Sequence, residues 1–478
     1  MIGIPEDTME SVISFFKTID SYVWQFPDQL PFMVVLLVGT GIFTTFFLGW
    51  PQLKRVKHAI DITRGLFDDP KDSGDVTHFQ ALSAALSATI GIGNIAGTAF
   101  AIHYGGPGAL FWMWVTAIFG TSLKYAECTL SMKYRIINPD GSASGGPMYY
   151  IEQGLGWKWL AVVFAIGATL CSLGTGNAAQ ANTIADQFLH DLGIPTWITG
   201  ILIAILVGMV IIGGMRRIGQ VASKLTPTMT VIYVIGGLVI LISHADRLPD
   251  AFRQIFEGAF TPTGAVGGFA GSVFINTLIW GIRRGLFSNE AGQGSAPIAH
   301  AAAKTTEPVR EGTVAMVGPY VDTIIVCSIT GLSIIVTNAW TAVDEFGVAY
   351  NGAPLTSHAF ATGLTFLNGY GSYVVTASVF LFALSTMITW SYYGDRSLQY
   401  LFNNKWVMPY RFFFCGVLFV AAVVKLEVVW RFTDIVLAFM TIPNLIAILA
   451  LSGITRRITG EYYSRKHVPY KDRIARRE

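Results

Sequence analysis

Long apolar runs recur along the whole of this 478-residue sequence, and they constrain its fold more than any other feature. Hydrophobic residues make up 52% of the chain and charged residues only 13%. The apolar residues form continuous runs and do not alternate with a helical or strand period. An α-helix needs roughly 20 predominantly apolar residues to cross the roughly 30 Å hydrocarbon core of a bilayer. The sequence therefore predicts an all-α integral membrane protein that crosses the membrane many times.

Polar breaks between these runs divide the chain into eleven predicted transmembrane helices. They cover residues 31–50, 77–103, 107–132, 157–189, 196–215, 222–243, 269–303, 314–337, 370–402, 406–424 and 432–454. This topology places 23 of the 32 Lys and Arg on one side of the membrane and five on the other. Cytoplasmic loops carry the excess of Lys and Arg. We therefore expect a multi-pass protein of the plasma (inner) membrane, with its N-terminus outside and its C-terminus in the cytoplasm.

Two of the predicted spans contain sequences that interrupt a helix. Span 269–303 would form a continuous helix of roughly 52 Å, too long for a bilayer, and its break is predicted between Gly281 and Pro297, where four glycines occur. Span 77–103 contains SATIGIGNIAG, in which three glycines surround Asn94. Glycines also allow close packing between membrane helices. Packing alone does not explain why the interruptions take matching positions in two halves of the chain.

The ten spans that follow the first one divide into two groups of five, and each group begins with an interrupted helix. Because five is odd, the second group crosses the membrane inverted relative to the first. This pattern is typical of secondary transporters, whose sites lie at discontinuous helices. The expected parts are an extracellular or periplasmic leader (1–30), an extra N-terminal helix (31–51), two five-helix repeats (77–243 and 269–454) and a basic cytoplasmic tail (455–478) that sits against anionic lipid headgroups.

Four segments of the sequence carry a family resemblance. They read SATIGIGNIAGTA (87–99), GGPGALFWMWVTAIFG (105–120), GTGNAAQANTIAD (174–186) and FSNEAGQGSAPIAHAAAKT (287–305). They resemble the alanine/glycine:cation symporter family, the sodium:alanine symporters, and the likeness extends from about Pro31 to Arg457. The resemblance implies a LeuT-like fold, a 5+5 inverted repeat with one extra N-terminal helix. It also implies sodium-coupled uptake, with alanine or glycine as substrate.

The interrupted helices offer groups for both ends of an amino-acid zwitterion. A half-helix that starts after Gly93 leaves N–H groups unpaired, so the backbone from Gly91 to Asn94 can hold a carboxylate. Glycine lets a ligand approach these amides closely. Carbonyl groups freed around Phe287, Ser288 and Glu290 can accept hydrogen bonds from the ammonium group. Asn94 either contacts the substrate or ties the unwound backbone.

The resemblance points to four further substrate residues, namely Asn177, Gln180, Thr386 and Trp390. Trp390, with Phe287, would close over a small side chain, although a tryptophan in an apolar span also serves packing. For sodium we expect hydroxyl groups of Ser385, Thr386 and Thr389, together with oxygen atoms near Thr89 and Ile90. The alternative is that these hydroxyls bond to carbonyls one turn back in their own helix.

Four ionisable residues at membrane depth, namely Arg283, Arg284, Glu290 and Asp322, are functional candidates because a charge there is costly. We expect them to pair with one another as a gate or structural ion pair at the broken helix; direct contact with the substrate is the alternative. Glu127, Asp186 and Asp395 lie closer to span ends and are interpreted as interfacial charges.

No nucleophile–base pair, HExxH motif or metal cluster occurs in the spans, which argues against an enzyme. The expected partners are a small amino acid, co-transported Na⁺ and membrane lipid, with no nucleic acid and no obligatory protein partner. A proton-coupled symporter of the same fold is the nearest alternative, and a channel is a more distant one.

Overall fold

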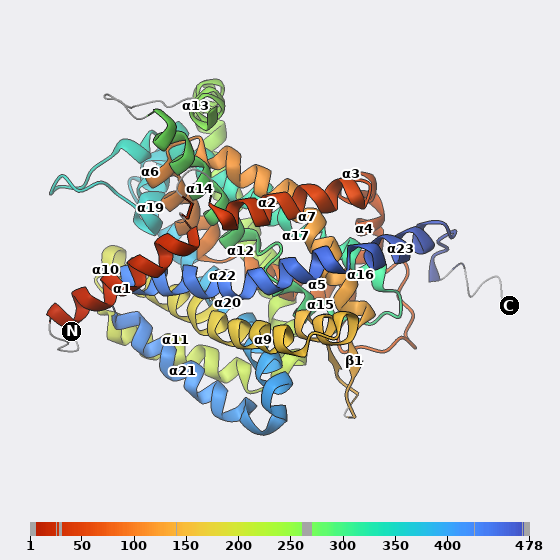
Figure 1. Ribbon diagram of the computed structural model, residues 1–478. Helices are drawn as coiled ribbons and strands as arrows, with labels where there is room; N and C mark the ends of the chain where they lie inside the picture. The colour runs from red at the N-terminus through yellow and green to blue at the C-terminus, as the bar shows by residue number, and fades with distance from the viewer. Residues whose placement is uncertain are drawn as a thin grey trace.

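The computed structural model describes residues 6–24, 26–27, 31–139, 141–260, 270–424, 426–470 and 472 of this chain. It is a bundle of helices whose long members run roughly along one direction (Figure 1). Helix α1 lies near one end of the bundle and α23 near the opposite end (Figure 1). The predicted all-α class agrees with this architecture.

The elements up to residue 243 include a first set of long helices, two short strands and several single turns. They are α1 (Glu6–Trp24), α2 (Phe32–Phe47), α3 (Pro51–Lys54), α4 (Val56–Thr63), α5 (His78–Thr89), η1 (Gly93–Gly97), α6 (Thr98–Gly105), α7 (Ala109–Lys133), β1 (Ile136–Ile137), β2 (Ala143–Ser144), α8 (Pro147–Tyr150), η2 (Ile151–Leu155), α9 (Lys158–Leu173), η3 (Gly174–Ala178), α10 (Ala179–Leu192), α11 (Thr196–Ile211) and α12 (Gly214–Ser243). Strands β1 and β2 pair antiparallel, with Ile136 opposite Ser144.

The remaining elements form a second set of helices. They are η4 (Ala245–Arg247), α13 (Leu248–Phe260), α14 (Ala270–Asn289), α15 (Ala296–His300), α16 (Pro308–Ala315), α17 (Val317–Pro319), η5 (Tyr320–Cys327), α18 (Ser328–Val336), η6 (Ala339–Thr341), α19 (Gly352–Gly363), η7 (Thr365–Leu367), α20 (Ser372–Phe402), η8 (Asn403–Trp406), α21 (Val407–Val423), α22 (Leu426–Ala450) and α23 (Ser452–Tyr463).

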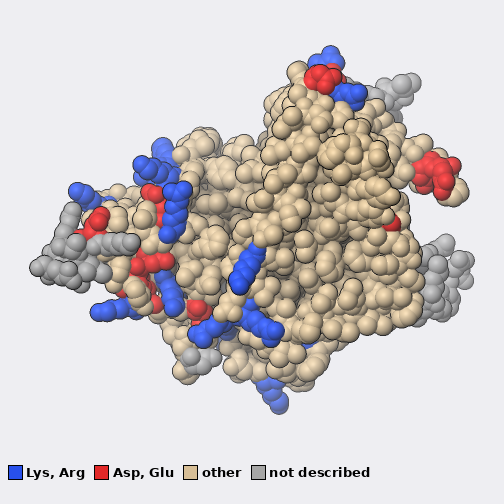
Figure 2. All heavy atoms as spheres, turned by 180° about the vertical axis from the view of Figure 1, so that it is seen from behind, with Lys and Arg blue, Asp and Glu red and all other residues tan. Residues whose placement is uncertain are grey.

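Long apolar helices confirm that this is a multi-pass membrane protein. Within the described ranges, five helices are long and apolar enough to cross a membrane, or six if the bent pair formed by α5 and η1–α6 counts as one span. The total of eleven membrane spans expected from the sequence therefore stays a prediction. Large apolar side chains such as Ile242 and Phe412 are exposed on the outer surface, as expected for side chains that face lipid. Charged side chains gather toward the end of the molecule that Figure 2 shows on the left, and a broad face is left without them.

The two interrupted spans lie side by side in the middle of the bundle. Helix α14 packs against α6 and η1, and α15 packs against α5. Both halves of one span therefore contact the other span. Helices α12 and α20 also pack on α5, and α7 packs on α14 and α15. This arrangement encloses both interruptions.

The predicted leader forms a helix that packs on the bundle. Helix α1 contacts α22, and the indole Nε1 of Trp24 donates a hydrogen bond to the backbone oxygen of Asp434 (3.2 Å). Trp24 is completely buried. The side of the membrane on which this helix lies stays a prediction, as do the boundaries of the two repeats and of the tail.

Candidate functional site

Helix α5 ends at Thr89, and the chain bends by 51° before the helical path resumes at Gly93. The unwound amides are held by side chains. The Gly91 N–H donates to Asn94 Oδ1 (3.0 Å), and the Ile92 N–H donates to Gln180 Oε1 (3.3 Å). Asn94 therefore ties the unwound backbone, which is one of the two roles predicted for it.

Two glycines at this interruption are required by close neighbours. A Cβ atom on Gly91 would lie 2.6 Å from Thr386 Oγ1 and 3.2 Å from Gln180 Oε1. A Cβ atom on Gly93 would lie 2.9 Å from Phe287 Cδ1. The structure thus brings Gly91, Gln180 and Thr386 together, and it seats Gly93 against the second interrupted span.

The second interruption follows Asn289, where α14 ends. Its backbone takes left-handed conformations, with φ of 52° at Glu290, 79° at Gly292 and 86° at Gly294. A residue with a Cβ rarely adopts such angles. The left-handed conformation of Glu290 therefore indicates that the surrounding residues hold the backbone in place here.

Two polar residues from other helices hold this second interruption. Glu127 Oε2 accepts hydrogen bonds from the Gly294 N–H (3.1 Å) and from Asn444 Nδ2 (2.8 Å). Asn444 Nδ2 also donates to the Gly292 backbone oxygen (2.8 Å). The sequence analysis missed Asn444 and interpreted Glu127 as interfacial. Glu127 is in fact completely buried, and its charge within an apolar span was the signal that could have identified it.

A buried network joins the two interruptions. Asn94 Nδ2 donates to Asp322 Oδ1 (2.6 Å) and to Ser288 Oγ (3.1 Å). The Ser288 hydroxyl in turn donates to Asp322 Oδ2 (3.0 Å). Asp322 therefore bonds to both interrupted spans from η5.

Trp390 and Asn177 occupy different surroundings. The Trp390 Nε1–H donates to Glu290 Oε1 (2.9 Å), and a Cβ on Gly176 would collide with the Trp390 side chain. Trp390 thus lies beside the second interruption. Asn177 points instead toward α21, where its amide donates to the Phe414 backbone oxygen (2.8 Å), so the structure does not bring it into this group.

Hydroxyl groups of α20 gather at the last turn of α5. The Thr386 hydroxyl donates to the backbone oxygens of Ser87 (3.0 Å) and Ala88 (3.2 Å). The Ser385 hydroxyl reaches Ser87 O (3.2 Å) but also donates to Phe382 O (2.9 Å) in its own helix. Thr389 donates to the Ser87 hydroxyl (3.0 Å). Such hydroxyl and carbonyl oxygens are ligands that suit a hard cation.

Thr89 and Ile90 take less direct positions in this cluster. The Thr89 hydroxyl donates to Ala85 O (3.2 Å), one turn back in its own helix. This is the bonding pattern that the sequence analysis kept as the alternative for such hydroxyls. Ile90 follows in the unwound stretch. The carbonyl oxygens that meet the α20 hydroxyls are those of Ser87 and Ala88, which the sequence analysis did not single out.

The expected mutual pairing of Arg283, Arg284, Glu290 and Asp322 is wrong. Arg283 pairs with Asp20 and Asp434, and Arg284 pairs with Asp434 (2.5 Å). Glu290 and Asp322 are bonded by the groups described above. We call the four residues Arg283, Arg284, Asp20 and Asp434 the arginine cluster. The sequence analysis missed both aspartates because they come from α1 and α22, far away in the chain.

A second buried cluster of ionisable side chains lies on the other side of the two interruptions, toward the end of the bundle where α23 lies (Figure 1). Glu311 of α16 accepts from Nδ1 of His78 and from Nδ1 of His300 (2.5 Å for the latter). All three side chains are buried. We call them the histidine cluster; it joins α5 and α15, the halves of the interrupted spans that face this end. Positions 78, 300 and 311 share no local motif, so their pairing was not predictable from the sequence.

Comparison with known proteins relates the chain to transporters. The sodium:alanine symporter family matches residues 9–475. The sodium/alanine symporter AgcS of Methanococcus maripaludis is 42% identical over 448 residues, which are 92% of this chain and 95% of the relative. An uncharacterized transporter of Haemophilus influenzae is 41% identical over 467 residues, 97% of this chain and 98% of the relative.

Solved structures give the fold. The crystal structure of MhsT in complex with L-phenylalanine matches with a TM-score of 0.56 and 12% sequence identity, and the match covers 81% of this chain and 98% of that one. The chain thus resembles transporters of the LeuT fold, as the sequence predicted.

Proposed function

Because the chain belongs to the sodium:alanine symporter family, we propose that it carries a small neutral amino acid, alanine or glycine, across the membrane together with Na⁺. Transport proceeds by alternating access, and the site lies at the two interrupted helices. Coupling to protons is the second candidate, because the described structure holds buried carboxyl groups beside both interruptions.

The observation that carries this proposal is the contact between the two interruptions. Gly93 of the first span fits against Phe287 of the second, and Asn94 bonds to Ser288 across the same contact. Irregular backbone at membrane depth is tolerated where it is buried in protein or lines a cavity. Two such stretches in contact supply both N–H donors and carbonyl acceptors at one place, which an amino-acid zwitterion requires.

In the proposed complex, the substrate carboxylate binds the amides of Gly91 and Ile92. It takes over the hydrogen bonds that the side-chain oxygens of Asn94 and Gln180 accept from those amides. The ammonium group binds backbone oxygens between Phe287 and Glu290. Trp390 is fixed by its bond to Glu290, so its ring and that of Phe287 limit the size of the side chain.

Na⁺ binds between α5 and α20 in this proposal. Ser385, Thr386 and Thr389 supply hydroxyl oxygens, and the last turn of α5 supplies carbonyl oxygens from Ser87 to Ile90. The cation would hold the end of α5 in place, and the unwound amides of Gly91 and Ile92 follow directly. Occupation of one site therefore organises the other, and the coupling is reciprocal.

Equilibrium binding of radiolabelled alanine to the purified protein, with and without Na⁺, tests the site. We expect Na⁺-dependent binding in the wild type and its loss, by about ten-fold or more in affinity, in Asn94→Ala and Thr386→Ala. Thr169→Ala is the matched control, because among the described contacts the Thr169 hydroxyl bonds only to Ala165 O in its own helix. Wild-type affinity in both site variants would show that the site lies elsewhere.

Uptake into proteoliposomes separates the two coupling ions. We expect uptake to stop when choline replaces Na⁺ at fixed pH and to persist when a protonophore collapses the pH gradient. The reverse pattern would establish proton coupling.

We also propose that the N-terminus lies outside and the C-terminus in the cytoplasm. The gathering of Lys and Arg side chains at one end of the bundle (Figure 2) supports this orientation. An impermeant maleimide applied to intact cells should label Thr341→Cys and leave Ser464→Cys unlabelled; both positions are exposed. The opposite labelling would invert the topology.

A further inference from the structure

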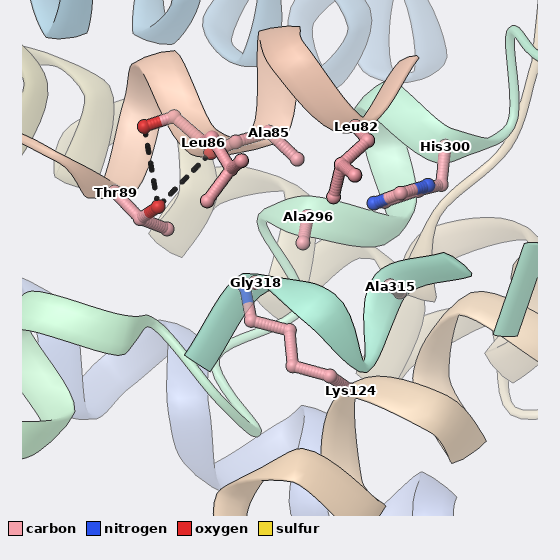
Figure 3. Close-up of a pocket in the computed structure, with 9 residues that line it drawn as sticks. All are labelled: Leu82, Ala85, Leu86, Thr89, Lys124, Ala296, His300, Ala315 and Gly318. Carbon is pink, nitrogen blue, oxygen red and sulfur yellow. Dashed lines mark hydrogen bonds between the residues drawn. The ribbon is translucent and has the colours of Figure 1, made fainter. Parts of the chain in front are cut away.

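A small cavity lies on the cytoplasmic side of the two interruptions in the proposed orientation. Residues of α5, α7, α15, α16 and α17 line it, and its volume is about 10 Å³. That is close to the room that one water molecule needs, roughly 10–15 Å³. Figure 3 shows Lys124 extending from α7 toward Gly318 of α17, while Thr89, Ala296 and His300 line other parts of the same cavity.

Lys124 is a buried basic residue that has no hydrogen-bond or ion-pair partner among the described residues. Only 2% of its surface is exposed, and no described residue accepts a hydrogen bond from it or forms an ion pair with it within 4 Å. Its charge acts through space on Glu127, Glu290 and Asp322. A charged group at this depth usually has a pairing or transport role, and the ammonium group of Lys124 faces the cavity instead of an acid.

The cavity adjoins both interruptions. Thr89 is the last residue of α5, two positions before Gly91, and Ala296 is the first residue of α15, after the second interruption. The histidine cluster joins α5 and α15 to α16 beyond the cavity. Movement of α5 and α15 away from α7 and α17 would widen this space and connect the central site with the cytoplasm.

We propose that Lys124 forms a second, release-side binding site for the α-carboxylate of the amino acid as it leaves toward the cytoplasm. This inference rests on the proposed function. The carboxylate passes from the amides of Gly91 and Ile92 to the ammonium group of Lys124, which forms a charge-assisted hydrogen bond with it. The Thr89 hydroxyl, which now bonds to its own helix, adds a second donor.

Transport measured separately from the two faces of the membrane tests this site. In inside-out vesicles, where the cytoplasmic face is accessible, Lys124→Gln should raise the half-saturating alanine concentration about ten-fold or more. In right-side-out vesicles the same variant should change it less than about two-fold. Lys124→Arg, which keeps a cation and its donors, should restore most of the cytoplasmic affinity.

Equilibrium binding of alanine in Na⁺ shows whether Lys124 instead neutralises the neighbouring acids. The proposal requires that Lys124→Gln leave this central-site affinity near that of the wild type. If Lys124→Gln loses equilibrium alanine binding and also loses alanine affinity on both faces of the membrane, Lys124 acts as a fixed counter-charge and the proposal is overturned. An unchanged alanine affinity on the cytoplasmic face would overturn it as well. Lys133→Gln, an exposed position at the end of the same helix, is the matched control.

Replacement of cytoplasmic chloride by gluconate separates a carboxylate site from a chloride site. Wild-type transport should persist in gluconate; a requirement for chloride that disappears in Lys124→Gln would overturn the carboxylate assignment. If the wild type shows no Na⁺-dependent alanine binding at all, the proposed function fails, and that outcome is distinct from every result of the Lys124 variants.

Discussion

The arginine cluster and the histidine cluster join helices on opposite sides of the two interruptions, and they use different chemistry. In the arginine cluster, two cations from α14 share Asp434 of α22, and Arg283 also pairs with Asp20 of α1. In the histidine cluster, Glu311 of α16 is shared by one imidazole from α5 and one from α15. Each cluster therefore ties an interrupted span to its neighbours.

The two clusters differ in the kind of basic group that they contain. A guanidinium group stays charged at any physiological pH, and those of Arg283 and Arg284 also lie over the rings of Trp280 and Trp430. An imidazole gains or loses its proton near neutrality. One cluster is therefore joined by permanently charged guanidinium groups, and the other by the Nδ1 atoms of two buried imidazoles that share one carboxylate.

Removal of the shared acid in the arginine cluster should have the largest effect. Asp434→Asn leaves two buried guanidinium groups without their common partner, and breaking a buried pair in this way costs about 3–5 kcal/mol. Thermal unfolding followed by size-exclusion chromatography should show a large loss of stability. Asp20→Asn should lose less stability than Asp434→Asn, because Asp20 pairs with Arg283 and not with Arg284. An equal loss in both variants would contradict the central position of Asp434.

Glu311→Gln should have the next largest effect on stability, about 1.5–3 kcal/mol, the range for hydrogen bonds to a charged group. Glu311 is the acceptor that both imidazoles share, so its loss should let α5 and α15 open more readily from α16.

Hydrogen exchange of α5 and α15 measures that opening in the wild type and the variant. At one fixed pH, exchange in both helices should be faster in Glu311→Gln. Equal exchange in the two proteins would show that Glu311 does not hold these helices together.

The docked C-terminal segment offers a third test at the same end. His58 of α4 bonds to the Tyr462 hydroxyl (2.8 Å), and burial, with a smaller contribution from His467, lowers the pKa of His58 to about 4. Docking of the C-terminal segment favours the neutral imidazole of His58. The contribution of His58 to the stability of docking is therefore fully present above the ordinary histidine pKa of about 6.5, and it is lost as the pH falls toward 4.

Limited proteolysis at about pH 7.5 and pH 5 measures this docking. Cleavage between residues 452 and 470 should increase at the lower pH in the wild type. His58→Gln, which keeps a polar side chain and cannot titrate there, should flatten the difference. Equal pH dependence in both proteins would exclude His58 as its source.

The smallest effect is expected where an ion pair is exposed. Arg465 forms two hydrogen bonds with Glu307 at the end that carries the histidine cluster, but Arg465 lies largely in solvent. Exposed pairs contribute about 0–1 kcal/mol. Glu307→Gln should therefore change the unfolding midpoint little. A loss of stability as large as that of Glu311→Gln would show that the difference in burial between Glu307 and Glu311 does not determine their contributions.

Several features of the candidate site were predictable because they are local in the sequence. Both interruptions fall where glycines cluster, and the predicted residues Gly91, Gln180 and Thr386 meet in the structure. The partners of the charged residues were not predictable in the same way. Arg283 was correctly recognised as unusual at membrane depth, yet its acids come from α1 and α22.

The sequence by itself determined the membrane class, the family and the two places where helical winding stops, because apolar runs and glycine clusters act on the backbone within a few residues. Only the tertiary structure decided that Asn94 bonds to Asp322, that Glu127 supports the second interruption and that Lys124 faces a cavity. The physical reason is that a side chain's partner depends on which helix faces come together, and these faces belong to segments far apart in the chain.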